Sequence, residues 1–396
     1  MILGGSQLQL DAIKKSISMG NKTIVCDMDP DAIGFNEIGA IKEVISTLDK
    51  ESVLMAAKKH NIDGIITVAS DQPINTVAYV GEALGLNAIS IDSAKMATNK
   101  FLMREQLSKT IIAIPEYYFC ASFEEFKKSV QALLNKYGKC IVKPVDSSGS
   151  RGVELVDRTN SNNLQNIYNY VKNESRTGAL IIEEFMEGNE ISVETFSENG
   201  KVNFIQITDK ITTGPPHFVE MGHIQPANLT TDDIFKIKSL VIDALKALNI
   251  NFGPSHTEIM MTKNGPKIIE IGARLGGDYI TSDLVPLSTG VDLTKAVIDG
   301  ALDREVDLTV KKQDASAVLF FKSKKGIINN IVGISILEKM SEVHSFKFYY
   351  KNGDYVTDTT SSSSRLGHVI FKGKSYDEML ELMNRIRNLI KIDIKE

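Results

Sequence analysis

The feature that most constrains the fold is the alternation of short apolar runs with amphipathic stretches along the first 93 residues. The runs that we expect to form strands are MIL, KTIVCDMD, DGIITVAS and NAISID. The stretches expected to form helices between them cover residues 11–19, 50–60 and 74–84. Because continuous apolar strands separated by helices are typical of a parallel sheet covered on both faces, the sequence predicts an α/β unit here.

The Gly4-Gly5 pair after the first run is a weak signal for dinucleotide binding. The third glycine of the GxGxxG pattern is missing, although Asp27 or Asp29 ends the second run at a suitable distance. A tight turn between strand and helix explains the same two glycines. Both interpretations stay open, and we favour the turn.

The pattern changes twice further along the chain. Ser122 and Glu125 form a capping box that opens a helix, and pairs of apolar runs follow it as far as residue 307. Beyond that point short strands precede one last helix, for which Ser375 and Glu378 predict a second capping box. The 396 residues, at roughly 150 per domain, suit two or three domains. The expected domains are a parallel-sheet unit over 1–94, a second unit over 95–307 with a lid at about 110–182, and a small α+β unit over 308–396.

Composition excludes several classes of protein. Lysine and arginine number 45 against 50 aspartates and glutamates, so the net charge of −5 argues against a nucleic-acid-binding protein. The cysteines Cys26, Cys120 and Cys140 lie far apart without a CxxC pattern, which indicates free thiols in a reducing compartment. No run approaches the roughly 18 apolar residues of a membrane span, and the first residues lack the features of a signal peptide. We therefore expect a cytoplasmic protein that binds neither nucleic acid nor membranes.

A loop of small residues, Asp146–Gly152, follows an apolar run that contains Lys143. Glycines and serines of this kind let backbone N–H groups converge on an anion, and an inward-pointing strand lysine requires an anionic partner. The GxxxxGK[ST] pattern of a Walker A loop is absent. The alternative is an ordinary hairpin turn, which the loop taken alone would favour.

The glutamates Glu258 and Glu270 lie on the two arms of a hairpin for which we predict an Asn264-Gly265 turn. With an odd-numbered loop the two carboxylates face each other with Cβ atoms roughly 5 Å apart, where like charges destabilise a sheet. A cation is then expected between them, and oxygen-only ligands suit Mg²⁺ carrying nucleotide phosphates. With a two- or four-residue loop the glutamates lie on opposite faces as surface charges. The spacing alone leaves both arrangements open.

Three further segments contain candidate binding residues. Arg274, four residues beyond Glu270, either contacts phosphate or carboxylate oxygens or forms a structural salt bridge. His217 and His223 lie in a segment rich in glycine and proline, which is typical of binding loops, although a lone loop histidine is usually solvated. The acidic segment IIEEFMEGNEISVE is either an exposed hairpin or an edge that contacts a purine. No HExxH, GxSxG or paired Cys/His set occurs, so zinc and serine hydrolases have no support.

In their order and spacing, these segments resemble the ATP-grasp superfamily of carboxylate–amine and carboxylate–thiol ligases. The segments that carry the resemblance are TNKFLMRE, IVKPVDSSGSRG, IIEEFMEGNEISVE, HTEIMM and KIIEIGARLGG. The resemblance covers nearly the whole chain and implies a Rossmann-like N-terminal domain, a two-part nucleotide clamp and a small C-terminal lobe. Within the superfamily, PPHFVEMGHIQPA and EIGARLGGD are similar to L-amino-acid ligases that form dipeptides or related amides.

The resemblance also implies roles for individual residues. Lys100 and Lys143 match lysines that hold the nucleotide phosphates, and Arg274 matches the arginine that steadies an acyl-phosphate. Glu258 and Glu270 match the Mg²⁺ carboxylates, which favours the odd-numbered loop. The other implied nucleotide-binding residues are the flap Ser147, Ser148, Gly149, Ser150 and Gly152, the adenine hinge Glu183, Glu184 and Met186, and the ribose-binding Glu190. The residues that we expect near the amino-acid substrate are His217, His223, Arg274, Gly276, Gly277 and Asp278.

One position departs from the family pattern. Many members have asparagine two residues after the second metal glutamate, where this chain has Gly272, and this puts the second metal ion in doubt. The implied reaction transfers the γ-phosphoryl group of ATP, with Mg²⁺ or Mn²⁺, to a carboxylate, and an amine then attacks the acyl-phosphate. A homodimer that acts on small-molecule carboxylates and amines is also implied. The alternatives are an ATP-grasp carboxylase of the purine or biotin-dependent type, a subunit that binds ATP without turnover, and, far behind, a nicotinamide dehydrogenase.

Overall fold

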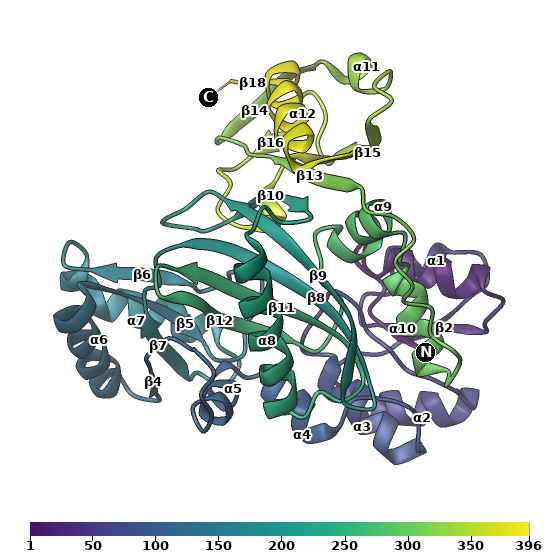
Figure 1. Ribbon diagram of the computed structural model, residues 1–396, viewed down its shortest axis with the longest axis horizontal. Coiled ribbons are helices and arrows are strands. Elements are labelled where there is room, and N and C mark those ends of the chain that lie inside the picture. The colour runs from purple at the N-terminus through teal and green to yellow at the C-terminus, as the bar shows by residue number, and fades with distance from the viewer. Residues whose placement is uncertain (396) are drawn as a thin grey trace.

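The computed structural model of the protein describes residues 1–395, and its N-terminal region lies at one side of a long central sheet (Figure 1). This region contains β1 (Ile2–Leu3), α1 (Leu10–Ser18), β2 (Thr23–Asp27), the 3-10 helix Ile33–Asn36, β3 (Ala40–Val44), α2 (Lys50–His60), α3 (Ile74–Leu84) and α4 (Ile91–Ala97). Its three strands pair in the order β1-β2-β3, and both pairs are parallel. The parallel sheet that the alternating pattern predicts is confirmed.

For two of the runs in this region the strand prediction is wrong. The run DGIITVAS contributes only an isolated bridge, between Ile66 and Ile2. The run NAISID forms no strand, because Ser90 caps α4 with a side chain that accepts a hydrogen bond from the Ser93 N–H. The strand β3 has no clear sequence signal, since its residues AIKEV are half polar and partly exposed, as suits the edge of a sheet.

A small antiparallel sheet lies at the opposite side of the molecule (Figure 1). Its region comprises α5 (Lys100–Leu107), β4 (Tyr117–Cys120), α6 (Phe123–Tyr137), β5 (Lys139–Pro144), β6 (Glu154–Asp157), the 3-10 helix Ser161–Asn163, α7 (Leu164–Glu174) and β7 (Leu180–Glu184). The strands pair in the order β4-β7-β5-β6. The capping box of Ser122 and Glu125 is confirmed at the start of α6, and Gly138 ends this helix in a left-handed conformation. The buried face of α6 packs against this sheet, with Phe126 and Leu133 in one cluster with Val142.

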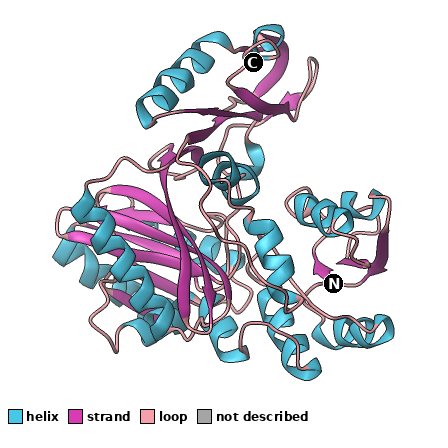
Figure 2. Cartoon of the chain, turned by 45° about the vertical axis from the view of Figure 1, so that its right-hand side comes forward, coloured by secondary structure: helices cyan, strands magenta, loops and turns pink. Residues whose placement is uncertain are grey.

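The central sheet has eight strands in the order β12-β11-β8-β9-β10-β13-β17-β15. The strands are β8 (Asn189–Glu198), β9 (Lys201–Thr212), β10 (Glu220–Gln225), β11 (Gly253–Thr262), β12 (Gly265–Gly272), β13 (Ala315–Phe321), β15 (Val343–Phe348) and β17 (Gly367–Gly373). The associated helices are α8 (Thr231–Ala247), the π-helical turn Ile280–Leu284, α9 (Val285–Thr289) and α10 (Leu293–Ala301). Figure 2 shows helices packed against this large sheet, and the buried side of α8 shares a core with Ile191, Val193 and Ile259.

The C-terminal region forms the top of the molecule in Figure 1. It adds β14 (Gly326–Val332), α11 (Ile334–Leu337), β16 (Tyr355–Val356), the 3-10 helix Ser362–Ser364, α12 (Tyr376–Leu389) and β18 (Lys391–Lys395). These strands make a separate sheet in the order β16-β14-β18, but β13, β15 and β17 belong to the central sheet. At the start of α12 the Ser375 side chain caps the helix, as predicted. Glu378 accepts from the Lys374 N–H instead of the Ser375 N–H, so the second half of the predicted capping box is not formed.

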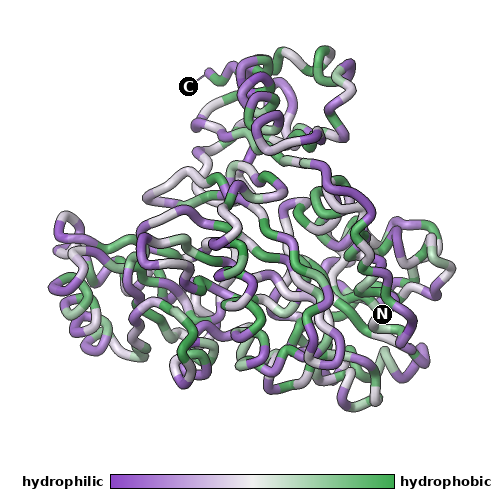
Figure 3. The backbone as a smooth tube through the Cα atoms, in the orientation of Figure 1, coloured by the Kyte–Doolittle hydropathy of each residue, from purple (hydrophilic) through white to green (hydrophobic). Residues whose placement is uncertain are grey.

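The apolar and polar residues of the chain are distributed as this architecture requires. Figure 3 shows hydrophobic and hydrophilic residues alternating along the peripheral helices, whose apolar sides face the sheets. All three cysteines are buried and unbonded, as their wide spacing predicts. Within residues 1–395, no helix is long and apolar enough to cross a membrane.

Candidate active site

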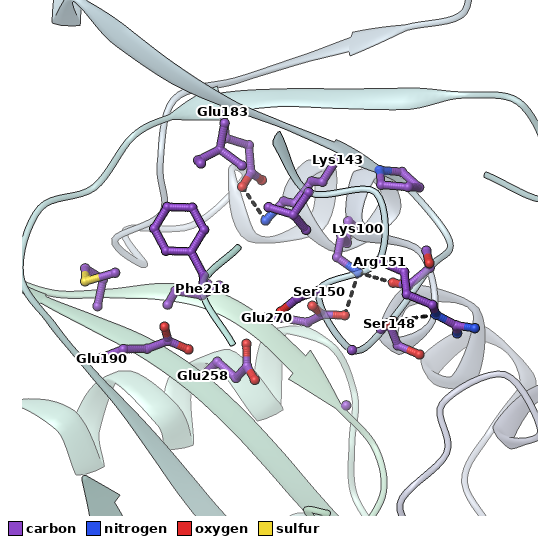
Figure 4. A pocket seen from close by; sticks show the side chains of 18 of the residues that line it. Lys100, Lys143, Ser148, Ser150, Arg151, Glu183, Glu190, Phe218, Glu258 and Glu270 are labelled. Carbon is purple, nitrogen blue, oxygen red and sulfur yellow. Dashed lines mark hydrogen bonds and ion pairs between the residues drawn. The ribbon is translucent and has the colours of Figure 1, made fainter. Parts of the chain in front are cut away.

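A pocket lies between the small antiparallel sheet and the central sheet (Figure 4). One wall comes from β5, β7 and the loop after β5, and the other from β8, β11 and β12. The ionisable residues that line it are Asp71, Lys100, Lys143, Arg151, Glu183, Glu184, Glu190, Glu220, His256, Glu258, Glu270 and Arg274. The apolar residues that line it are Ile141, Val153, Phe185, Met186, Phe218, Met260 and Ile269. Apolar surface combined with convergent polar groups is typical of a ligand-binding pocket.

Lys143, on β5, is held in the pocket wall by an ion pair. Its Nζ atom lies 2.6 Å from Glu183 Oε2, and Arg104 of α5 donates from Nε to the other carboxylate oxygen at 2.7 Å. Burial alone would raise the pKa of Glu183, but attraction to Arg104 and Lys143 lowers it to about 2. Burial lowers the pKa of Lys143, which shares Glu183 with Arg104. Because both carboxylate oxygens of Glu183 are engaged, its side chain is not free for the adenine contact that the resemblance implies.

Lys100 enters the pocket from the first turn of α5. The Asn99 side chain caps this helix, and the Lys100 Nζ atom then donates to Glu270 Oε1 at 2.8 Å and to the Ser147 carbonyl at 2.6 Å. Burial works against the charge, but the attraction of Glu270 raises the pKa of Lys100 above its ordinary value. Lys100 therefore links a predicted metal carboxylate to the predicted phosphate-binding loop (Figure 4).

The loop between β5 and β6 curls over the pocket. Gly149 and Ser150 adopt positive φ angles of 65° and 58°, which turn the backbone sharply. Ser147, Ser148, Gly149 and Ser150 all line the pocket, as predicted for a flap. Gly152 does not line it: a Cβ atom there would lie 2.7 Å from Glu174 Cβ, so this glycine is explained by close packing.

Glu258 and Glu270 face each other across β11 and β12, but not for the predicted reason. Thr262 pairs with Gly265, so the turn contains two residues, Lys263 and Asn264, and the predicted odd-numbered loop is wrong. A two-residue turn by itself would place the glutamates on opposite faces. A bulge beyond Glu258 shifts the register by one residue and brings Glu270 opposite it.

The cations next to these two carboxylates are lysine side chains of the protein. Lys100 holds Glu270, and Lys210 of β9 donates to Glu258 Oε1 at 2.9 Å. Lys210 also contacts Glu190, and its Nζ atom lies 3.6 Å from Glu220 Oε1. Burial opposes its charge, but the three glutamates raise the pKa of Lys210 well above the usual value. Lys210 was not among the residues selected from the sequence, although a lysine within an apolar strand is the same signal that singled out Lys143.

Arg274 lies at the end of the pocket nearest the N-terminal region. Its Nε and Nη2 atoms donate to the two carboxylate oxygens of Asp71, at 2.8 and 3.2 Å. This pair explains Gly272, because a Cβ atom at that position would lie 2.8 Å from Asp71 Oδ1 and 3.4 Å from Arg274 Nε. The space that a side chain at position 272 would need is therefore filled by the Asp71–Arg274 pair.

A buried histidine lies next to Glu258, one of the two predicted metal ligands. His256 Nδ1 contacts the fully buried Glu194, and His256 Nε2 lies 3.6 Å from Glu258 Oε1. Burial would lower the pKa of His256, but Glu194 raises it to about 9. Gly276 completes this cluster by donating its N–H to Glu194 at 3.1 Å, and it does not line the pocket. Neither His256 nor Glu194 was among the residues selected from the sequence.

The predicted hinge residues line the other end of the pocket. Glu184 accepts from Lys267 Nζ at 2.8 and 2.9 Å, and Met186 follows it in the apolar wall. Glu190 contacts Lys210, while burial and the neighbouring Glu258 raise the pKa of Glu190. Their roles toward adenine and ribose stay predictions.

The residues selected for the amino-acid substrate are not gathered in this pocket. His217 is exposed, and neither it nor Gly277 lines the pocket. His223, on β10, is buried, and its Nε2 atom lies 3.6 Å from Asp278 Oδ2. Asp278 in turn forms a two-bond ion pair with Arg365 of the C-terminal region, at 2.6 and 2.7 Å. Of the selected substrate residues, only Arg274 lines the pocket itself.

The donor set agrees with a hard divalent cation carried by a nucleotide. Glu258 and Glu270 offer carboxylate oxygens on facing strands, and neither cysteine nor a set of histidines faces them, which suits Mg²⁺ better than zinc. Burial would raise the pKa of Glu258, but Lys210 and His256 hold it well below the usual value, so this carboxylate is charged. Among the described residues no three His, Cys, Asp or Glu side chains form a complete cage, so phosphate oxygens would have to supply the remaining ligands.

Two family models match the chain. The model described as an ATP-grasp domain matches residues 136–283, which include the loop after β5 and the two predicted metal glutamates. The model described as L-amino acid ligase C-terminal domain 2 matches residues 319–395. The chain contains an ATP-grasp domain. The family resemblance and the mixed α/β fold expected from the sequence are both confirmed.

Relatives of the chain agree with the two models. It is 24% identical over 363 residues to the L-arginine-specific L-amino acid ligase of Bacillus subtilis, covering 88% of this chain and 84% of that protein. It is 27% identical over 319 residues to the uncharacterized protein y4rH of Sinorhizobium fredii. That match covers 79% of this chain but only 64% of the length of y4rH. The ATP-grasp model and the ligase relative support an ATP-dependent carbon–nitrogen ligase.

A solved structure shows the same fold. The L-amino acid ligase from Bacillus licheniformis superimposes with a TM-score of 0.83 at 21% sequence identity. The match covers 100% of this chain and 98% of that one. The whole chain, including its C-terminal region, therefore has the architecture of that enzyme.

Proposed function

We propose that the protein joins a carboxylate to an amine, releasing ADP and phosphate, through an acyl-phosphate intermediate, and that at least one substrate is an L-amino acid. The proposal includes a cytoplasmic homodimer that uses small-molecule substrates, ATP and Mg²⁺, with Mn²⁺ as a substitute. The single observation that supports it best is the meeting of Lys100, Lys143, Glu258, Glu270 and Arg274 in one pocket.

Different residues of the pocket bind different parts of ATP in this proposal. The loop after β5 offers backbone N–H groups to the β- and γ-phosphates, and Lys143 and Lys100 supply positive charge at its base. Glu258 and Glu270 would hold Mg²⁺, which neutralises phosphate charge during transfer. In this proposal the apolar wall that contains Met186 accepts the base, and Glu190, which lines the same pocket, accepts a hydrogen bond from a ribose hydroxyl.

Arg274 is the group that we assign to the acyl-phosphate. Asp71 fixes the plane of its guanidinium. Nη2 donates to Asp71 and Nη1 to the Leu275 carbonyl, so each keeps one N–H for oxygens that gain charge in the transition state. Phosphoryl transfer depends mostly on positioning and charge neutralisation, which fixed cations of this kind supply. The amine then attacks the acyl carbon, the amide forms, and the C–O bond to phosphate breaks.

A subunit that binds ATP without turnover is the main rival, because Gly272 replaces an asparagine of the family pattern. The structure gives this glycine another reason, since it makes room for the Asp71–Arg274 pair. Both lysines and both glutamates are in place, which a protein that only binds ATP would not need. The rival therefore explains fewer of the residues present.

Phosphate release from Mg-ATP tests the proposal. The assay is run with pooled L-amino acids and, separately, with bicarbonate and candidate amines. Stimulation by amino acids with ADP as the second product supports the ligase. Stimulation only by bicarbonate moves the protein to the carboxylase class, and ATP binding without any phosphate release favours the rival subunit.

A further inference from the structure

A second polar cluster adjoins the nucleotide pocket where the C-terminal region meets the central sheet. Arg365 lies just before β17, and its Nη1 and Nη2 atoms donate to the two carboxylate oxygens of Asp278. The guanidinium carbon lies 3.6 Å above the ring of Phe320 on β13, which fixes the plane of the cation. Arg365 is buried, whereas Asp278 keeps 22% of its side chain exposed.

Two features of this cluster are unusual for a purely structural ion pair. Asp278 and Tyr279 adopt consecutive left-handed conformations, with φ angles of 50° and 65°, although neither is glycine. Strain of this kind persists where the surroundings impose it, and it concentrates at binding sites. Beside Asp278, the Nδ1 atom of the buried His223 lacks a hydrogen-bond partner anywhere in residues 1–395, and Nε2 has only the Asp278 carboxylate at 3.6 Å. A buried polar group without a partner indicates a missing ligand or water.

The guanidinium of Arg365 has more N–H groups than hydrogen-bond partners in this cluster. Its Nε atom donates to the Ser362 carbonyl, and Nη1 donates to the Glu220 carbonyl as well as to Asp278. Nη2 donates only to Asp278, so one of the five guanidinium N–H groups has no partner within the described chain. The cluster thus offers an incoming anion one arginine N–H and one imidazole nitrogen.

Glu220 connects this cluster with the nucleotide pocket. Its carboxylate lines the pocket and lies 3.6 Å from Lys210, while it also accepts a hydrogen bond from Ser362 at 3.0 Å. A ligand bound at Arg365 would therefore sit next to the reacting groups rather than on a remote surface.

The chemistry of the proposed reaction requires two separate cationic sites. The carboxylate that is activated must reach the γ-phosphate, where Arg274 lies among the metal glutamates. If the amine substrate is itself an amino acid, its own carboxylate remains free throughout. That second carboxylate needs a cation away from the metal site, and Arg365 is a buried arginine that borders the pocket through Glu220.

We propose that Arg365, with His223 and Asp278, binds the free α-carboxylate of an amine substrate that is an amino acid. The inference rests on the proposed function and makes it more specific. Asp278 holds the guanidinium in place before the substrate arrives, and the carboxylate of the substrate then takes the free N–H of Nη2. The C-terminal region thereby takes part in choosing the amine, since Arg365 and Phe320 both belong to it.

The test compares each proteinogenic L-amino acid with its carboxamide as the amine substrate, in the phosphate-release assay with Mg-ATP and with one activating L-amino acid at fixed concentration as the carboxylate substrate. A carboxamide keeps the amine but lacks the charge that Arg365 would bind. The variants are Arg365→Lys, which keeps the charge but not the planar fork, and the double variant Arg365→Leu/Asp278→Asn, which leaves no unpaired buried charge. Arg385→Lys on α12, an exposed arginine of the same region, is the matched control.

For the wild type we expect kcat/KM to be at least about tenfold higher for the acid than for its amide, which corresponds to about 1.4 kcal/mol. In both Arg365 variants this preference should fall toward unity, mainly through KM for the amino acid, while KM for ATP stays unchanged. Arg385→Lys should keep the wild-type preference.

Equal losses for acid and amide would overturn the inference and leave Arg365 with a structural role only. A wild type that accepts acid and amide equally well would do the same. These two outcomes leave the ligase proposal intact. If no amino acid stimulates phosphate release in the wild type, the proposed function fails first and the inference fails with it.

Discussion

At Gly272 a single methyl group decides whether Arg274 keeps its partner. A Cβ atom there would lie 2.8 Å from Asp71 Oδ1, so Gly272→Ala must displace the carboxylate that orients the arginine. We expect kcat/KM for the ligase reaction to fall at least about tenfold, or about 1.4 kcal/mol of transition-state stabilisation. Asp71→Asn, which removes the charge but not the space, should have a similar effect. Wild-type kinetics for Gly272→Ala would contradict this explanation of the glycine.

Lys210 balances three glutamates, so its removal should destabilise the fold as well as the site. Lys210→Met leaves Glu190, Glu220 and Glu258 without their shared cation in a buried place. Breaking a buried ion pair on one side costs about 3–5 kcal/mol, and we expect a loss of that order in the free energy of unfolding. Denaturant unfolding at pH 7 measures it, with the exposed Lys238→Met on α8 as the control. A loss below about 1 kcal/mol would show that the charges are solvated.

Glu183 makes the stability of the protein depend on acid pH. Its pKa falls from 4.5 to about 2 on folding, so its ion pairs stabilise the folded state fully above pH 4.5. This contribution, on the order of 3 kcal/mol, is lost as the pH falls toward 2. The difference in unfolding free energy between wild type and Glu183→Gln should therefore shrink between pH 5 and pH 3. The exposed Glu105→Gln on α5 should show no such trend. A difference that stays constant with pH would contradict the assignment.

At the scale of elements, the loop after β5 should be sensitive to its backbone conformation rather than to its packing. Gly149 has a φ of 65°, yet no atom lies within 4 Å of the position that a Cβ would take. In Gly149→Ala this open loop can relax, so the melting temperature should stay close to that of the wild type. The pocket-lining conformation with a left-handed alanine costs about 1–2 kcal/mol, so KM for ATP should rise. Gly152→Ala combines a φ of 71° with a contact of 2.7 Å, so it should also lower the melting temperature. If both variants lowered the melting temperature equally, the distinction between the two glycines would be wrong.

The elements also show what sequence patterns can and cannot predict. Helices with caps and clear amphipathic spacing were predicted within a residue or two, as α2 and α6 illustrate. Only the family resemblance favours an arrangement in which Glu258 and Glu270 face each other, because residue spacing gives no sign of the bulge that brings them together. Lys210, His256 and Arg365 come from three distant segments, so only the folded chain brings them to the site. Local patterns predicted the capped helices, whereas strand β3 and the register of β11 and β12 depended on tertiary pairing.

At the scale of the whole molecule, the C-terminal region is continuous with the catalytic sheet. β13 pairs with β10 and carries β17 and β15 at its other side, so the central sheet runs through the boundary that the sequence suggested near residue 308. A fragment that ends at residue 307 would leave β10 as an open edge and expose the core around Val219 and Leu284. We expect this fragment to aggregate, as judged by size-exclusion chromatography. A monodisperse, ATP-binding fragment would contradict the expectation.

The measurement that tests the central claim most directly follows oxygen from the carboxylate substrate. The substrate is prepared with both carboxylate oxygens as ¹⁸O, and the phosphate released during turnover with Mg-ATP is analysed by mass spectrometry. An acyl-phosphate intermediate requires one ¹⁸O atom in each phosphate and the other in the amide product. Released phosphate that contains no ¹⁸O, with amide formed at the same rate, would contradict the mechanism assigned to Arg274 and the two metal glutamates.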